Sequence, residues 1–214
     1  MGLAGLSAFG PLIAALAVTW RTGATRAIFG PWRVHPAWIV GGLLAPMTLD
    51  VIARALDVAT GGTLDAWVYL PSTPVHVAGL VVFSVGEEFG WRGYAQPRLV
   101  DRFGPVVGPL LLGTLWALWH AMYLVSPVTG RIEPVVLIVF ASLPAWSVIY
   151  VWAMQRGGGS IAIALALHAG AHLDKVDRLP VDAWTTRVWI VVVTWIAAGW
   201  AARALVSARR SRGA

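Results

Sequence analysis

The chain has 214 residues and not one cysteine. It therefore has no disulfide, no thiolate ligand for a metal and no cysteine nucleophile. The absence leaves open which redox compartment the protein occupies.

Charged side chains are also scarce, at 12% of the residues, whereas 58% of the residues are hydrophobic and the mean hydropathy is +0.72. Soluble domains carry roughly twice that share of charge, so this composition excludes an ordinary water-soluble fold. The net charge of +6 comes from cations scattered between apolar runs, not gathered on one surface. Membrane topology explains this distribution better than nucleic-acid binding, and we expect no nucleic-acid partner.

Seven apolar runs approach the length of about 20 residues that a helix needs to cross the hydrocarbon layer. They cover residues 3–20, 36–54, 75–96, 106–126, 134–154, 159–173 and 186–206. The connections are short, and many of the thirteen Trp lie where runs begin or end, as in aromatic belts. We predict an all-α, polytopic integral membrane protein, with about seven transmembrane helices in one bundle around a polar site and a single domain over 1–214.

Most of the sixteen cations fall on one side if Met1 lies outside and the runs alternate. This bias predicts a cytoplasmic C-terminus, with a basic tail over residues 203–214. Its arginines, Arg209, Arg210 and Arg212, are expected to anchor the chain against anionic lipid. An outside amino terminus without a signal sequence also suggests one earlier helix that this sequence does not include.

Three charged residues interrupt the run 75–96, namely Glu87, Glu88 and Arg92. A charge at the membrane centre costs about 3 kcal/mol on insertion scales, so these groups must face the protein interior. Glu88 and Arg92 are four residues apart and can form an ion pair on one helix face. Glu87 points about 100° away from Glu88 and stays available for other neighbours. The alternative is that both carboxylates only hold helices together.

Imidazoles interrupt two later runs. His120 ends an apolar stretch, and His168 and His172 form H-A-G-A-H, which places both rings on one helix face. A lone buried His is often an interhelical hydrogen bonder, but two in one apolar helix are hard to explain as packing. Asp50 and His76 we interpret as a loop-proximal acid and an interfacial imidazole.

Three of the predicted helices thus each deliver proton-active groups, and a carboxylate beside an imidazole in a dry pocket is what water activation requires. Attack on an amide creates an oxyanion, and imidazole N–H groups can stabilise it.

Three sequence motifs resemble those of the CAAX protease and bacteriocin-processing family, also called the Abi family. GEEFGWRGYAQPRL (86–99) resembles its E-E-x-x-x-R motif, WALWH (116–120) its second motif, which ends in His, and LHAGAH (167–172) its third, H-x-x-x-N. The opening FGPLIAALAVTW (9–20) looks like an early helix of bacterial members. The ordered motifs on separate helices make residues 75–173 the expected catalytic core.

The resemblance implies an all-helical intramembrane endopeptidase, related to enzymes that remove the last three residues of prenylated CAAX proteins. It implies that Glu87 and His120 activate the attacking water, that His168 and His172 stabilise the oxyanion, and that Glu88 and Arg92 support them. The family's usual Asn is His172 here, which changes the length and tautomer of the donor.

Metal dependence stays open at this point, because Glu87, His120, His168 and His172 also make a plausible zinc set. We expect metal-free chemistry, with no cofactor. The chain lacks H-E-x-x-H, G-x-S-x-G and a pair of membrane aspartates, which sets aside the serine and aspartyl mechanisms.

The leading hypothesis is hydrolysis of a lipidated or membrane-embedded peptide in a bacterial plasma membrane. Two alternatives remain: a non-catalytic scaffold or bacteriocin-immunity-type protein of the same fold, and a proton-coupled transporter. The transporter ranks last because the runs show no repeated halves.

Overall fold

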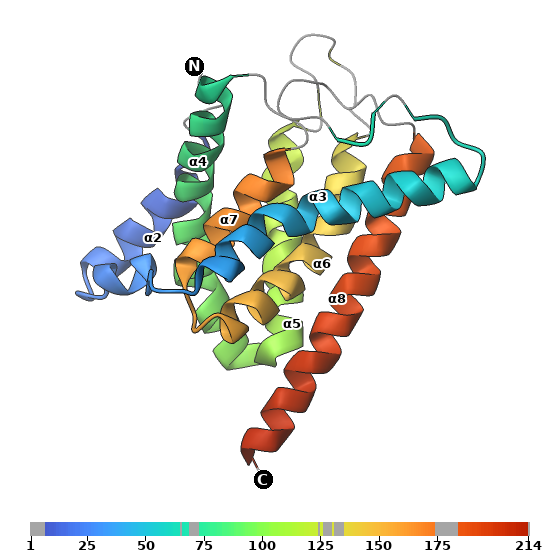
Figure 1. Ribbon diagram of the computed structural model, residues 1–214. Helices are drawn as coiled ribbons and strands as arrows, with labels where there is room; N and C mark the ends of the chain where they lie inside the picture. The colour runs from blue at the N-terminus through green and yellow to red at the C-terminus, as the bar shows by residue number, and fades with distance from the viewer. Residues whose placement is uncertain are drawn as a thin grey trace. The chain divides into compact units, whose positions relative to one another are not determined.

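The computed structural model describes residues 7–64, 66–68, 73–123, 125, 130, 135–173 and 184–213, and its regular elements there are helices (Figure 1). The α-helices are α2 (Gly10–Trp20), α3 (Pro36–Ala59), α4 (Pro74–Glu88), α5 (Gln96–Trp119), α6 (Val135–Arg156), α7 (Ile161–Leu173) and α8 (Trp184–Gly213). Three shorter segments are η1 (Thr25–Phe29), the π-helix η2 (Phe89–Ala95) and η3 (His120–Tyr123). The all-helical prediction is confirmed for these residues.

Each of the seven apolar runs overlaps one of the helices α2 to α8. The run 36–54 ends too early, because α3 continues to Ala59. Asp50 is therefore not loop-proximal, as the sequence suggested, but lies within α3 with only 3% of its surface exposed. Asp50, Arg54 and Asp57 are spaced four and three apart, so they share one buried face of the helix. Thr186 of α8 donates a hydrogen bond of 2.6 Å to Oδ2 of Asp57.

Two helices are long and apolar enough to cross a membrane among the residues described. They are Pro36–Ala59, with a mean hydropathy of 1.6, and Trp184–Ser211, with 1.7. Gly10–Trp20 and Ile161–Leu173 are shorter apolar helices. The basic residues after 203 continue α8 as far as Gly213.

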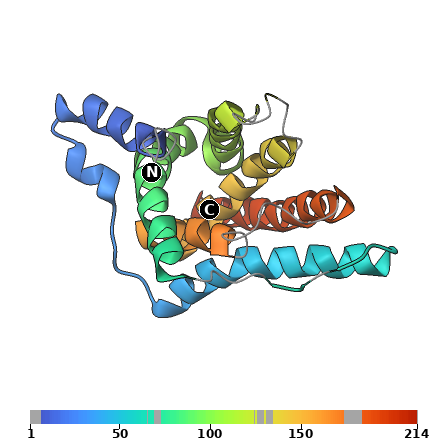
Figure 2. The ribbon, with the colours of Figure 1, turned by 90° about the horizontal axis from the view of Figure 1, so that it is seen from above.

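The chain divides into two compact units that interleave along the sequence. The first is built from described residues within 1–48, 66–98 and 153–179, and the second from those within 49–65, 99–152 and 180–214. In the first unit α4 contacts both α7 and α2, and η2 contacts α2 and η1 (Figure 2).

Glycines permit the close packing of η2 in the first unit. A Cβ on Gly86 would lie 2.7 Å from the carbonyl oxygen of Ala8. A Cβ on Gly90 would overlap the carbonyl group of Pro11, and one on Gly93 would overlap that of Ile28. Because only hydrogen fits at these positions, the backbone of the preceding segments lies directly against α4 and η2.

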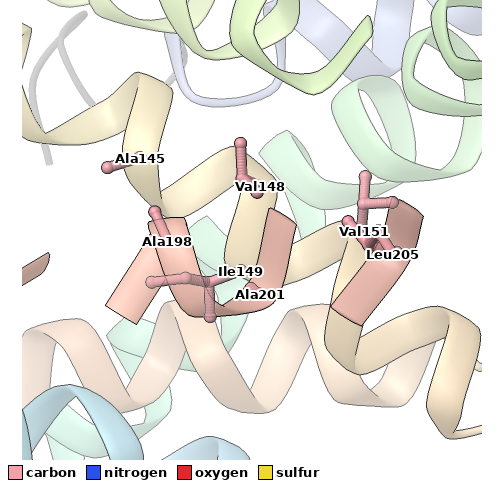
Figure 3. Close-up of a cluster of buried hydrophobic side chains, with 7 residues drawn as sticks. All are labelled: Ala145, Val148, Ile149, Val151, Ala198, Ala201 and Leu205. Carbon is pink, nitrogen blue, oxygen red and sulfur yellow. The ribbon is translucent and has the colours of Figure 1, made fainter. Parts of the chain in front are cut away.

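The core of the second unit lies between α6 and α8. It consists of the buried residues Ala145, Val148, Ile149, Val151, Ala198, Ala201 and Leu205 (Figure 3). Small side chains alternate with branched ones there, so the two helices approach closely and still fill the space between them.

Candidate active site

The site begins at the C-terminal end of α4, where Glu88 is fully buried. Its Oε1 accepts a hydrogen bond of 2.9 Å from Nη1 of Arg92, which confirms the predicted i,i+4 pair. The same oxygen lies 2.6 Å from Nδ1 of His168 on α7. The Glu88 carboxylate therefore joins α4 and the adjoining η2 to α7, where His168 lies 80 positions further along the chain.

The contacts of Glu88 also fix the tautomer of His168. Arg92 is a permanent cation, and a carboxylate that is ionised beside it only accepts hydrogen bonds. Nδ1 of His168 must then be the donor to Oε1. The ring is 4% exposed, and this contact sets its orientation.

The second oxygen of Glu88, Oε2, is buried without a hydrogen-bond partner among the described residues. An unsatisfied buried oxygen costs about 1–3 kcal/mol. The hydrogen bonds of Oε1 stabilise the network of Glu88, Arg92 and His168, whereas the unsatisfied Oε2 destabilises it. Unsatisfied buried groups of this kind are common at functional sites.

His172 lies one turn beyond His168 on α7, and the two rings stack with their centroids 5.2 Å apart and an interplanar angle of 28°. This confirms the prediction that both imidazoles share one helix face. His168 is buried, whereas His172 is exposed. The pair therefore extends from the buried contact with Glu88 to an exposed position on α7.

Glu87 is the last residue but one of α4 and is half-buried. The chain continues directly into the π-helix η2, which contains Arg92. A π-helix adds a residue to the turn and so changes the direction of the side chains that follow. The two consecutive glutamates therefore differ in burial: Glu88 is fully buried, whereas Glu87 is half-buried.

His120 belongs to the second unit, where it begins η3 after the end of α5. Its Nδ1 lies 2.8 Å from the backbone carbonyl oxygen of Trp116. A carbonyl only accepts, so Nδ1 carries the proton and the neutral ring has its lone pair on Nε2. The imidazole also packs edge-on against Trp116, with ring centroids 5.9 Å apart, and Trp116 packs in the same way on Tyr150.

No group of three or more His, Asp or Glu side chains within the described part of the chain is arranged to hold a metal ion. The predicted zinc set includes three residues of the first unit, Glu87, His168 and His172, and His120 of the second. The side chain of His76 lies outside the described residues, and His35 accepts a hydrogen bond of 3.2 Å from the backbone N–H of Ala37 at the start of α3.

Two features of the site were not predicted from the sequence. The contact between Glu88 and His168 joins residues 80 positions apart, and no local spacing indicates it. The π-helix follows directly on α4, and the glycines at 90 and 93 were its one visible signal.

The described helices and the buried Glu–Arg–His network define an all-helical protein with a buried polar site, in which two helices are long and apolar enough to cross a membrane. Residues 69–173, which include all three motifs, match the family model described as type II CAAX prenyl endopeptidase Rce1-like. This match agrees with the predicted resemblance to the CAAX protease and bacteriocin-processing family over this segment.

A curated relative of this chain is the CAAX prenyl protease 2 of Methanococcus maripaludis. The two are 28% identical over 102 residues, which make up 45% of this chain and 38% of the relative. The match thus spans well under half of the relative's length.

Proposed function

We propose that this chain is an intramembrane endopeptidase that hydrolyses a peptide bond of a lipidated or membrane-embedded substrate. The buried hydrogen bond between Glu88 and His168 is the observation that carries this proposal. The family match and the relative's name support the same class of reaction. In this proposal the helices α2 to α8 form the seven-span bundle expected from hydropathy, in a bacterial plasma membrane with the C-terminus in the cytoplasm.

The attacking water is activated by Glu87 together with His120. The carboxylate of Glu87 takes one proton as the water oxygen bonds to the scissile carbonyl carbon, and the carbonyl oxygen becomes an oxyanion. When the C–N bond breaks, the proton passes to the departing amine, so no base is consumed. Nε2 of a neutral His120 is an acceptor and assists in this transfer, because its Nδ1–H is held by Trp116.

His168 and His172 stabilise the oxyanion. The Glu88 carboxylate supports this role as the partner of Nδ1, and the role requires a protonated Nε2 that donates towards the site. His120 has a neutral carbonyl as its partner and lacks this support. The two histidines therefore differ in role because their Nδ1 partners differ in charge.

The proposed mechanism uses no metal. A zinc ion held by Glu87, His120, His168 and His172 is the competing version, and it would leave the hydrogen bond from Nδ1 of His168 to Glu88 in place. A zinc-bound His168 would need Nε2 as its ligand atom, which removes the oxyanion donor.

The decisive experiment is cleavage of membrane-anchored peptides by the purified protein. We expect Glu87→Gln and His120→Ala each to lower kcat by at least about 10²-fold, the usual contribution of a positioned base. Asp101→Asn is the matched control, because Asp101 is an exposed carboxylate on α5 and should leave kcat unchanged.

The other outcomes separate the alternatives. Equal behaviour of wild type and both variants would rule out the peptidase and favour the scaffold or immunity protein. Loss of activity with a zinc chelator, restored by added zinc, would favour the metal version. A proton or solute flux in liposomes that depends on Glu87 would favour the transporter.

A further inference from the structure

A cavity of ≈ 390 Å³ lies in the second unit, and no residue of the proposed mechanism lines it. It is lined by Phe103, Gly104, Pro105, Val106 and Val107 of α5 and by Val206, Arg209 and Arg210 of α8. None of these lining residues is acidic. The cavity therefore combines two permanent positive charges with an apolar wall.

The shape of the cavity follows from a break in α5 at Gly104. Its backbone angles, φ 85° and ψ 172°, are not helical, and Pro105 follows directly. A Cβ on Gly104 would lie 3.2 Å from Nη1 of Arg209, so glycine leaves room for the guanidinium to lie over the backbone. The helical segment that begins at Pro105 also directs the positive end of its dipole to this place, which adds to the arginine charge.

The apolar part of the wall is exposed. Phe103 is 43% exposed, Val107 51% and Val206 39%. These side chains flank the cavity at the end of α8, whose apolar stretch is long enough to cross a membrane and ends near Ser211. Arg209 and Arg210 lie in the last turns of that stretch, at the depth where cations contact lipid headgroups.

A ligand that pairs with both arginines and also covers the apolar wall of the cavity must be an anion with an apolar tail. We propose that this cavity binds one anionic glycerophospholipid of the surrounding membrane. The phosphodiester is held between the guanidinium groups of Arg209 and Arg210, and an acyl chain lies along Val107 and Val206. Guanidinium groups bind phosphate oxygens through paired N–H donors, which makes this a specific site, in contrast to diffuse attraction to a charged surface.

The test uses the full chain in mixed micelles of detergent with either phosphatidylglycerol or phosphatidylcholine, and native mass spectrometry to count the lipids retained. We expect wild type to retain phosphatidylglycerol preferentially. Arg209→Gln with Arg210→Gln should weaken retention by at least about five-fold, roughly the effect of one cation at an anionic surface. Val107→Trp should weaken retention as well, because it fills the cavity without changing any charge.

The matched control is Arg21→Gln with Arg26→Gln, which removes two exposed arginines of the first unit. This control should retain lipid as wild type does. An equal loss in both arginine pairs, or full retention by Val107→Trp, would show general surface attraction and overturn the proposal. Displacement by soluble glycerophosphoglycerol as efficiently as by the lipid would show a phosphate site with no role for the acyl chain, and would also overturn it. None of these outcomes depends on peptidase activity.

Discussion

Glu87 and Glu88 are adjacent in the chain but differ in burial and in their contacts. Glu88 is fully buried and holds Arg92 and His168, whereas Glu87 is half-buried at the end of α4. The difference follows from the rotation of about 100° between consecutive helical residues. One carboxylate thus lies within the buried network, whereas its neighbour lies at a partly exposed position of the same helix.

Glu88→Gln tests the positioning role. The amide keeps the shape of the side chain but removes the negative charge that faces Nδ1 of His168 and Nη1 of Arg92. We expect kcat to fall by about 10²-fold, as when an oxyanion donor is lost, with little change in KM. A drop in stability of about 3 kcal/mol should accompany it, because buried Arg92 loses its counter-ion. Kinetics on the folded fraction from size-exclusion chromatography check this. A KM effect at constant kcat would contradict it.

His172 is the residue that departs from the family motif, and its replacement by Asn tests whether a donor suffices. His172→Asn should retain kcat within about three-fold, because the amide also donates a hydrogen bond, and His172→Leu should lose about 10²-fold. The exposed position of His172 means that neither variant should unfold the protein. If the Leu variant kept full activity, His172 would have no part in stabilising the oxyanion.

Contacts between residues that are close in the sequence could be predicted from the sequence. The Glu88–Arg92 pair and the stacked His168 and His172 follow from i,i+4 spacing alone. The contact of Glu88 with His168 could not, because it depends on how α4 packs against α7. Sequence spacing therefore predicted only one of the two partners of Glu88.

At the scale of elements, hydrophobic runs predicted all seven helices, since burial in lipid or protein demands a continuous apolar stretch. Their ends and interruptions were harder. Helix α3 continues past the apolar run because Asp50, Arg54 and Asp57 are buried on one face. The π-helix and the break at Gly104 depend on close backbone contacts that hydropathy does not report.

The close packing of η2 against η1 leads to a prediction for a glycine-to-alanine substitution. Gly93→Ala places a methyl group on the carbonyl oxygen of Ile28, so the backbone of η1 or η2 must move. Such overpacking costs about 1–3 kcal/mol or more, and thermal unfolding in detergent should show a lower midpoint. Gly199→Ala is the matched control. It lies on α8 with no neighbouring atom within 4 Å of the new methyl, and it should raise the midpoint slightly through helix propensity. Equal midpoints for the two variants would contradict the packing described here.

At the scale of the whole molecule, the sequence predicts an orientation that connects the lipid cavity to one leaflet. If the C-terminus is cytoplasmic, Arg209 and Arg210 meet the inner surface of the membrane, where the positive-inside bias places most cations. Because the chain has no cysteine, any thiol that is introduced is the single site for labelling. The protein is thus suited to a direct test of topology.

That test compares Ser211→Cys with Thr63→Cys, both at exposed positions. Ser211 lies near the end of α8 and Thr63 follows α3, in a segment predicted to face outside. In intact cells an impermeant maleimide should label the thiol at position 63, and the thiol at 211 only after the membrane is permeabilised. The reverse pattern would place the arginines in the outer leaflet. The anionic lipid would then have to be drawn from that side, and the charge bias of the sequence would have failed to predict the orientation.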